Sequence, residues 1–169
     1  MPQPAKILAF AGSLRKDSWN KKLIAIAAAG AREAGAEVTL IDLHDYQLPL
    51  YDGDLEAAEG LPAKALELKQ LFQSHQGLLI ASPEYNSSYP AVLKNTIDWV
   101  SRPNPANPAE PPLGGLADKI AAIMATSPGA LGGIRVLVPL RMLLSNLSML
   151  VIPNQLALPK AHELFDAAG

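Results

Sequence analysis

The chain alternates short apolar segments with longer segments of helical periodicity, and this alternation runs from one end of the sequence to the other. The apolar segments are nearly continuous runs, which are typical of strands covered on both faces, as in a parallel sheet. Right-handed crossover connections would place the intervening helices on both faces of that sheet. The pattern therefore predicts a single α/β domain over residues 1–169, a three-layer sandwich around a five-stranded parallel sheet.

Glycine and proline mark the boundaries of these segments. Gly35 stands where a cap should end the first helix, and Pro62 and Pro90 suit the first turns of two further helices. In chain order, the predicted elements are strand Lys6–Ala11, helix Asn20–Ala34, strand Glu37–Ile41, the long connection Asp42–Leu61, a helix from Pro62, strand Gly77–Ser82, loop Pro83–Tyr89, a helix from Pro90, the proline-rich loop Pro103–Pro112, strand Ile120–Ala125, loop Thr126–Gly133, helix Gly133–Leu147 and strand Met149–Ile152.

Composition narrows the functions open to this chain of 169 residues. A content of 49% hydrophobic and 18% charged residues fits a globular domain, and a net charge of −2 lacks the basic excess of a nucleic-acid binder. The absence of cysteine excludes disulfides, iron–sulfur clusters and a cysteine nucleophile. The three histidines, His44, His75 and His162, are too far apart in sequence for a helical zinc pair, so no metal site is expected.

The sequence also lacks the marks of a targeted or membrane-bound protein. The N-terminal residues have no basic region followed by an apolar core, so they do not resemble a signal peptide. The densest apolar stretch, Ile134–Leu150, is interrupted by Arg135, Pro139 and Arg141 and falls short of the ~18 apolar residues of a membrane helix. We therefore expect a cytoplasmic protein without a membrane partner.

The loop after the first strand, Gly12–Asn20, has the features of an anion site. It leads into a helix N-terminus, where free N–H groups and the helix dipole attract negative charge. Ser13, Ser18 and Asn20 add neutral hydrogen-bonding groups, and Arg15 can pair with a phosphate. The glycine patterns of dinucleotide and P-loop sites are missing, which favours a terminal phosphate over a bridging pyrophosphate. Alternatively, Ser18 or Asn20 is a plain helix cap and Arg15 is a solvated side chain.

Two further loops stand at predicted strand ends. Prolines at both ends fix the loop Pro83–Tyr89, whose backbone can address the edge of a flat heterocycle, with Tyr85 between polar neighbours. The alternative is a tight connection on which Tyr85 packs. The loop Thr126–Gly133 contains three glycines, which permit a ligand to approach the backbone closely. They serve equally well as a simple turn before the next helix.

A strand order of 2-1-3-4-5 would gather these three loops around one crevice at the carboxyl edge of the sheet. The sequences of the loops, GSLRKDSWN at 12–20, SPEYN at 82–86 and TSPGALGG at 126–133, resemble the NADPH-dependent FMN reductase family, especially its quinone- and chromate-reductase branch. LPLYD at 48–52 and LKNTIDWVSRP at 93–103 extend the resemblance, which runs from Lys6 to about Asn154. It implies a flavodoxin-like fold with that strand order.

The resemblance implies a non-covalent FMN cofactor with NADPH or NADH as the hydride donor. It assigns the FMN phosphate to the first loop, the ring and ribityl chain to the second, and the other side of the ring to the third, with Tyr85 also contacting the substrate. No catalytic acid or base is expected, because the flavin itself carries the difficult step. The implied cofactor-binding residues are Ser13, Arg15, Ser18 and Asn20, then Pro83, Glu84, Tyr85 and Asn86, then Thr126, Ser127 and Gly129.

Acceptors implied by the resemblance are small molecules: quinones, free flavins, azo compounds or metal oxyanions such as chromate. It also implies a homodimer or homotetramer. A flavodoxin-type electron carrier would share the fold and the cofactor without having reductase activity of its own, but such carriers are strongly acidic and this chain is not. A phospho-receiver domain is excluded, because it needs acidic residues where this chain has Ala11-Gly12 and Ser82-Pro83.

Two features depart from the family pattern. Pro139 lies inside the fourth predicted helix, where it should cause a kink and so bears on assembly, since this helix often forms the family's oligomer contact. After the fifth strand only Lys160–Gly169 remains for a covering helix, and its apolar residues Leu164 and Phe165 are too few to cover the sheet edge. We therefore expect a longer native chain or a helix supplied by association.

Overall fold

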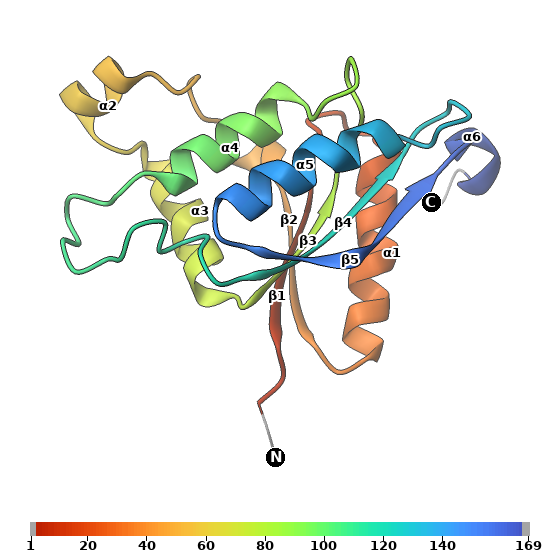
Figure 1. Cartoon of the computed structure of the whole chain (residues 1–169), viewed down its shortest axis with the longest axis horizontal. Helices are drawn as coiled ribbons and strands as arrows, with labels where there is room; N and C mark the ends of the chain where they lie inside the picture. Colours follow the sequence, from red (N-terminus) through yellow and green to blue (C-terminus); the bar gives the residue numbers. More distant parts are fainter. Residues whose placement is uncertain (1–2, 167–169) are drawn as a thin grey trace.

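The computed structural model describes residues 3–166 and has a five-stranded parallel sheet at its centre (Figure 1). The strand order is β2-β1-β3-β4-β5, which confirms the predicted flavodoxin-like topology. All neighbouring strands pair in parallel, and the pairing of β4 with β5 has a register shift between Ala121 and Ile123, whose partners are Val151 and Gln155. The strands are β1 Lys6–Ala11, β2 Glu37–Asp42, β3 Gly77–Ala81, β4 Ile120–Thr126 and β5 Leu150–Leu158.

Helices cover the two faces of the sheet unequally. The long helix α1 packs on one face, where the short helix α6 also lies, and α3, α4 and α5 pack on the other (Figure 1). The four predicted helices are all present, and each predicted boundary agrees with the structure to within one residue; no end was predicted for the helices from Pro62 and Pro90. The helices are α1 Trp19–Glu33, α2 Gly53–Glu59, α3 Ala63–Ser74, α4 Ala91–Ser101, α5 Ile134–Asn146 and α6 Ala161–Leu164.

Successive side chains on β1 point to opposite faces of the sheet, and those on one face are larger than those on the other. Leu8 and Phe10 point into the larger core cluster beneath α3, α4 and α5, whereas Ala9 and Ala11 face α1. Because alanine is small, α1 can lie close to the strands, and its buried Ala28 adds to this fit. All four of these β1 side chains are buried, as expected for a central strand covered on both sides.

The connection between β2 and α3 contains more regular structure than the sequence suggested. It holds a 3-10 helix over Leu43–Asp45 and the helix α2. Asp52 caps α2, since its carboxylate accepts a hydrogen bond from the Asp54 N–H at 2.9 Å. Gly60, at φ 76°, ends the helix in a conformation that suits glycine. Of the glycines expected to interrupt this connection, Gly53 is the first residue of α2 and Gly60 follows its last residue.

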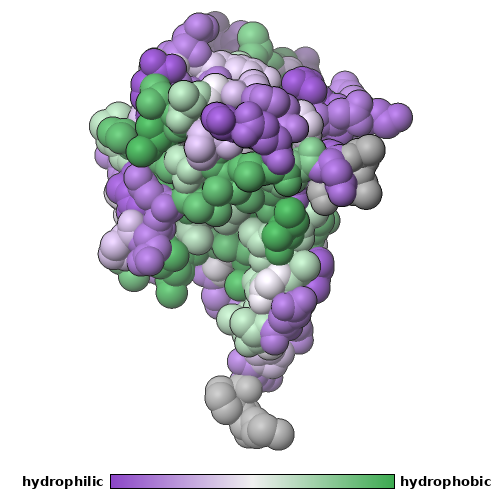
Figure 2. Space-filling view, turned by 90° about the vertical axis from the view of Figure 1, so that its right-hand side faces the viewer, coloured by the Kyte–Doolittle hydropathy of each residue, from purple (hydrophilic) through white to green (hydrophobic). Residues whose placement is uncertain are grey.

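The last strand is longer than predicted and is incompletely covered. Leu150 and Leu156 on β5 remain exposed, and Figure 2 shows apolar side chains gathered across the middle of this side of the molecule. The helix α6 is a single turn, and Phe165 after it packs against Trp19 of α1, with ring centroids 5.8 Å apart, instead of covering β5. A further helix over β5 stays a prediction.

Helix α5 runs from Ile134 to Asn146 without a break at Pro139. One side of it is buried through Val136, Leu137 and Leu140, which anchor the turns before and after the proline. The proline removes one backbone donor, but packing on the sheet keeps the helix continuous. The expected kink therefore does not divide α5.

Candidate functional site

The carboxyl ends of three neighbouring strands form the edge where the site was predicted. Ala11 of β1 pairs with Ala81 of β3, which in turn pairs with Met124 of β4. The first residue beyond each strand continues the ladder: the Gly12 N–H donates to the Ala81 carbonyl, and the Ser82 N–H donates to the Met124 carbonyl, both at 2.9 Å. The sheet register thus brings together the starts of all three predicted loops.

The first loop presents several donors at the start of α1. Among residues 3–166, no protein acceptor pairs with the N–H groups of Trp19 and Asn20. Ser18 occupies the N-cap position, but its side chain makes no capping bond. Arg15 is exposed, and its guanidinium donates to the Asp17 carbonyl at 3.0 Å. Unpaired N–H groups and an accessible arginine at a helix N-terminus are suited to an anion such as a phosphate.

The side-chain amide of Asn20, which the resemblance assigns to the phosphate, is engaged by the main chain of Thr126. This buried amide donates to the Thr126 carbonyl at 2.9 Å and accepts from the Thr126 N–H at 3.0 Å. The amide therefore joins the first loop to the third. Ser13 is also buried, and its hydroxyl accepts from the Arg15 N–H at 3.3 Å, which shapes the turn between them.

The second loop folds back on itself in a tight turn. Tyr85 and Ser88 exchange two main-chain hydrogen bonds, at 2.9 and 3.0 Å, and the residues between them, Asn86 and Ser87, have φ values of 51° and 66°. Positive φ at both central positions is the pattern of a type I′ turn, which asparagine tolerates better than most residues. The turn holds Tyr85 at the surface with 50% of its side chain exposed. The loop is thus a tight connection, as the alternative reading had it, with Tyr85 half exposed on it.

Glu84 connects the second loop to α5. Its carboxylate is almost fully buried and accepts from the Arg135 N–H at 3.1 Å and from Arg135 Nε at 2.6 Å, with an ion pair to the same guanidinium. A carboxylate at a helix N-terminus is stabilised by the free N–H groups there. The Glu84 carboxylate is thus engaged by Arg135 of α5, and the preceding residue, Pro83, is buried.

The third loop is fixed to the chain that follows β5. The Thr126 hydroxyl and the Ser127 N–H both donate to the Leu158 carbonyl, at 2.9 and 3.3 Å. Gly132, at φ 61°, lies so close to this segment that an added Cβ would come within 2.5 Å of the Leu158 carbonyl carbon. Gly129 is exposed, and its carbonyl accepts a hydrogen bond from the Lys160 N–H in the same segment after β5. This loop needs its glycines for a close backbone approach.

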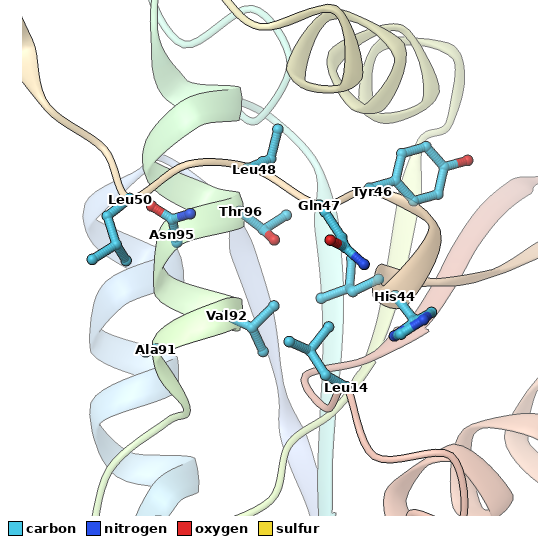
Figure 3. A pocket seen from close by; sticks show the side chains of 11 residues that line it. Leu14, His44, Tyr46, Gln47, Leu48, Leu50, Ala91, Val92, Asn95 and Thr96 are labelled. Atoms are coloured by element: carbon cyan, nitrogen blue, oxygen red, sulfur yellow. The ribbon is translucent and has the colours of Figure 1, made fainter. Parts of the chain in front are cut away.

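A cavity of about 500 Å³ lies beside the first loop, toward the β2 side of the sheet (Figure 3). Its walls come from Leu14 of the first loop, the start of α4, and the segment after β2 that we name the strap, residues 46–50. Sequence reasoning missed this cavity, because the strap belongs to a connection that carried no strong local pattern. The one sequence feature that could have pointed to this segment was LPLYD at 48–52, which is part of the resemblance to the family.

Helix α4 holds the strap in place through two side chains. Asn95 Nδ2 and Trp99 Nε1 both donate to the Pro49 carbonyl at 2.8 Å, and Asn95 Oδ1 accepts from the Tyr51 N–H at 2.8 Å. The Tyr51 ring also meets the Trp99 ring edge-on, with centroids 5.1 Å apart. The conspicuous LKNTIDWVSRP stretch therefore has a structural role: it positions one wall of the cavity.

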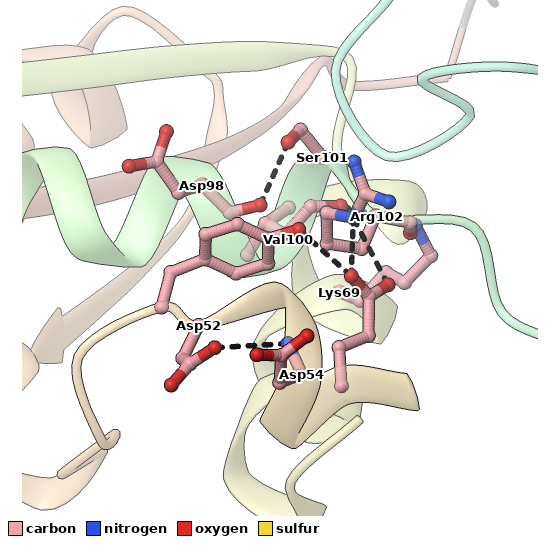
Figure 4. A network of polar contacts seen from close by, with 9 residues as sticks. Asp52, Asp54, Lys69, Asp98, Val100, Ser101 and Arg102 are labelled. Atoms are coloured by element: carbon pink, nitrogen blue, oxygen red, sulfur yellow. Dashed lines mark hydrogen bonds and ion pairs between the residues drawn. The ribbon is translucent and has the colours of Figure 1, made fainter. Parts of the chain in front are cut away.

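A polar network at the end of α4 fixes α2 as well. Arg102 lies at its centre (Figure 4) and donates from Nε to both carboxylate oxygens of Glu56 at 2.9 Å. The Tyr51 hydroxyl donates to the same carboxylate at 2.8 Å. Burial alone would raise the pKa of Glu56, but these hydrogen bonds outweigh it and hold the pKa below its ordinary value. Glu56 in turn raises the pKa of Tyr51 by accepting its proton in a hydrogen bond.

The donor set of the first loop fits an FMN phosphate. It combines helix N-terminal N–H groups, a serine hydroxyl that makes no capping bond and an accessible guanidinium. No cluster of histidine or acidic side chains suited to a metal ion occurs over residues 3–166. Within the same range, no helix has the length and apolar character needed to cross a membrane.

Comparison with known proteins agrees with this geometry. The pattern of the family described as NADPH-dependent FMN reductase matches residues 5–163. The quinone reductase of Escherichia coli K12 is 35% identical over 155 residues, covering 90% of this chain and 76% of that protein. A 2-hydroxy-1,4-benzoquinone reductase from Burkholderia sp. is 42% identical over 127 residues, covering 75% of this chain and 63% of that protein.

A solved structure supports the same relationship. FerB of Paracoccus denitrificans, a flavoenzyme described as an NAD(P)H:(acceptor) oxidoreductase, matches with a TM-score of 0.70 and 33% identity, over 89% of this chain and 78% of its own. The family pattern spans nearly the whole chain, and two relatives above 30% identity, the Escherichia coli quinone reductase and FerB, are covered over more than two thirds of their length, so this protein belongs to the NADPH-dependent FMN reductase family.

Proposed function

We propose that this protein is an FMN-dependent NAD(P)H oxidoreductase that reduces quinones. The observation that carries the proposal is the first loop, where unpaired N–H groups of α1 and the exposed Arg15 form a phosphate site inside a family of flavin reductases. The names of the relatives favour a reductase over an electron carrier, since both are reductases of quinones. Free flavins, azo compounds and chromate are further acceptors to be tested.

The residues take distinct roles in this proposal. Ser13, Arg15 and Ser18, with the N–H groups of α1, bind the FMN phosphate. Asn20 and Glu84 are positioning residues, because their side chains are already engaged by Thr126 and Arg135. The ring and ribityl chain lie against the main chain of Pro83–Asn86 and of Thr126, Ser127 and Gly129, and Tyr85 contacts the substrate from the exposed rim.

No acid or base is needed from this chain for the redox step itself. When bound, the flavin supplies the hydride acceptor and donor, and the protein contributes binding and orientation. We place donor and acceptor in turn on one open side of the ring, next to the exposed Tyr85. Because NAD(P)H is the donor, we place the reaction in the cytoplasm, where these nucleotides are abundant.

A homodimer or homotetramer is part of the proposal. Ile134, Val138 and Met142 follow one another at helical spacing along the outer side of α5 and are 47%, 69% and 68% exposed. A stripe of large exposed apolar side chains on one helix favours an interface. We expect Val138→Asp to shift the mass in analytical ultracentrifugation toward the monomer, whereas Ile26→Asp on α1 leaves it unchanged. Equal masses for wild type and Val138→Asp would argue against this interface.

Steady-state kinetics test the reaction. With FMN bound, initial rates measured against NADH or NADPH at several quinone concentrations should give parallel double-reciprocal lines, because the two substrates share one open side in turn. Intersecting lines would show that both bind together. Absence of NAD(P)H oxidation with every acceptor would refute the proposed function and leave the electron-carrier alternative. Replacing Tyr85 with Ala should change the KM values of both substrates more than it changes FMN retention.

A further inference from the structure

The second and third loops contain almost no charged side chains. Residues 82–90 and 126–133 include a single charged residue, Glu84, and the first charged residue after the third loop is Arg135 of α5. These two side chains form an ion pair with each other. Because Glu84 directly precedes the exposed Tyr85, the pair lies next to this rim. Arg135 is therefore the one cation that residues 82–90 and 126–135 supply there.

The two members of the pair differ in exposure. The Glu84 side chain is only 7% exposed, whereas that of Arg135 is 58% exposed. The carboxylate accepts from the main-chain N–H and Nε of Arg135 and pairs with its Nη2. Nη1 has no partner among residues 3–166, so its N–H groups are open to a ligand. The buried carboxylate thus holds one edge of the guanidinium, and the positive charge stays at the surface.

The start of α5 holds Arg135 in this orientation. Val136 and Leu137, the next residues of the helix, are buried against the sheet. Gly133, at φ 83°, lets α5 begin close to the second loop, because an added Cβ would lie 2.9 Å from the Ala125 side chain and 3.9 Å from that of Glu84. Since the protein itself fixes the guanidinium, little side-chain entropy is lost when it donates to a phosphate.

The hydride donors of the proposed reaction carry phosphate groups, whereas its quinone acceptors carry none. NADH and NADPH share a pyrophosphate, and a guanidinium can donate two parallel hydrogen bonds to such a group. A donor whose nicotinamide lies beside Tyr85 brings this charge to a rim where the loops around it offer Arg135 as the cation.

We propose that Arg135 binds the pyrophosphate of NAD(P)H and that Glu84 is the residue that positions its guanidinium. The inference rests on the proposed function and adds a contact to the hydride donor. It gives Glu84 a role toward the nucleotide, in place of the flavin contact that the resemblance implies. Because the pyrophosphate is common to both nucleotides, Arg135 serves NADH and NADPH alike.

Binding of unreactive nucleotides tests this assignment. Tetrahydro-NADH and tetrahydro-NADPH keep the pyrophosphate but cannot donate hydride, so equilibrium dialysis against the FMN-loaded protein measures their affinity without turnover. We expect Arg135→Gln to weaken both at least about tenfold, as for the loss of a hydrogen bond to a charged group. The hydride donor 1-benzyl-1,4-dihydronicotinamide has no phosphate, and its half-saturating concentration in flavin reduction should change by less than about twofold. The control is Arg32→Gln, which removes the same charge from an exposed position on α1 and should leave all three constants unchanged.

A double variant removes the risk that the unpaired carboxylate of Glu84 unfolds Arg135→Gln. Arg135→Gln with Glu84→Gln leaves no charge at this position and should bind the nucleotides as weakly as Arg135→Gln does. Because Glu84 acts through Arg135, Glu84→Gln should change nucleotide affinity only while Arg135 is present. An equal effect of Glu84→Gln in both backgrounds would overturn its positioning role.

The outcomes separate this inference from the proposed function. Unchanged nucleotide affinity in the Arg135 variants, with wild-type FMN still reduced by NADH or NADPH, would overturn the site and leave the proposed function standing. A loss confined to tetrahydro-NADPH would also overturn it, because Arg135 would then bind the 2′-phosphate instead of the pyrophosphate. Failure of both NADH and NADPH to reduce the FMN of the wild type would refute the proposed function, and this inference with it.

Discussion

The side-chain amide of Asn20 makes two hydrogen bonds with the main chain of Thr126, a residue 106 positions later in the chain. Asn20 follows the loop after β1, and Thr126 is the last residue of β4. These two strands are not neighbours in the sheet, because β3 lies between them. The amide therefore spans the middle of the carboxyl edge. It sets the distance between the first loop and the third loop.

Replacing Asn20 with Ala should destabilise the protein by about 2 kcal/mol, because two buried main-chain groups of Thr126 lose their partner. Urea unfolding at pH 7 measures this free energy. Asn107→Ala, in the loop before β4, removes an amide for which no side-chain partner is found over residues 3–166 and should change the free energy of unfolding by less than about 0.5 kcal/mol. Equal effects of the two substitutions would show that the hydrogen bonds between Asn20 and Thr126 do not stabilise the protein.

Arg15→Ala should weaken FMN binding at least tenfold, or about 1.4 kcal/mol, the lower end for a hydrogen bond to a charged group. Riboflavin, which lacks the phosphate, should bind equally to wild type and variant. Lys16→Ala serves as the control, because Lys16 is the neighbouring exposed cation. Titration of apo protein followed by flavin fluorescence gives both constants. If wild type binds riboflavin as tightly as FMN, the phosphate assignment is wrong.

Sequence reasoning predicted where the three loops begin, because parallel strands end at one edge of a sheet and apolar runs such as Lys6–Ala11 mark those strands. It did not find the function of Asn20, whose partner is fixed by the relative placement of β1 and β4. It also missed the cavity, since Leu48 and Leu50 form a wall only when Asn95 and Trp99 hold Pro49 between them. Local patterns predict elements and their ends, whereas contacts between distant segments depend on packing.

Acid should weaken the contact between α2 and α4. The pKa of Glu56 is lowered in the folded protein, so its contribution to stability is complete above the unfolded value of about 4.5 and is lost as pH falls through the folded value. Glu56→Gln should therefore lower the free energy of unfolding at pH 7 by about 1 kcal/mol and by much less near pH 3. Urea unfolding across this range measures the difference. The exposed Glu59→Gln on the same helix is the control, and a Glu56→Gln effect independent of pH would contradict the ion pair with Arg102.

The proline-rich loop is fixed by a buried ion pair between Lys69 of α3 and Glu110. Nζ of Lys69 lies 2.7 Å from Glu110 Oε1, and the two side chains are only 3% and 5% exposed. The same ammonium donates to the carbonyls of Val100 and Arg102 at 3.0 and 2.7 Å, whereas the other carboxylate oxygen of Glu110 has no partner among the described residues. Lys69 is thus a junction between α3, the end of α4 and the loop.

Replacing only Lys69 or only Glu110 should lower the free energy of unfolding far more than replacing both together. Lys69→Met leaves the Glu110 carboxylate buried without its cation, which we expect to destabilise the protein by about 3–5 kcal/mol. In the double variant Lys69→Met/Glu110→Leu no charge remains buried, so its loss should fall well below the sum of the two single losses. Urea unfolding of the four proteins closes a double-mutant cycle. Additive losses would show that the charges do not interact in solution, and the carbonyls of Val100 and Arg102 would then account for the position of Lys69.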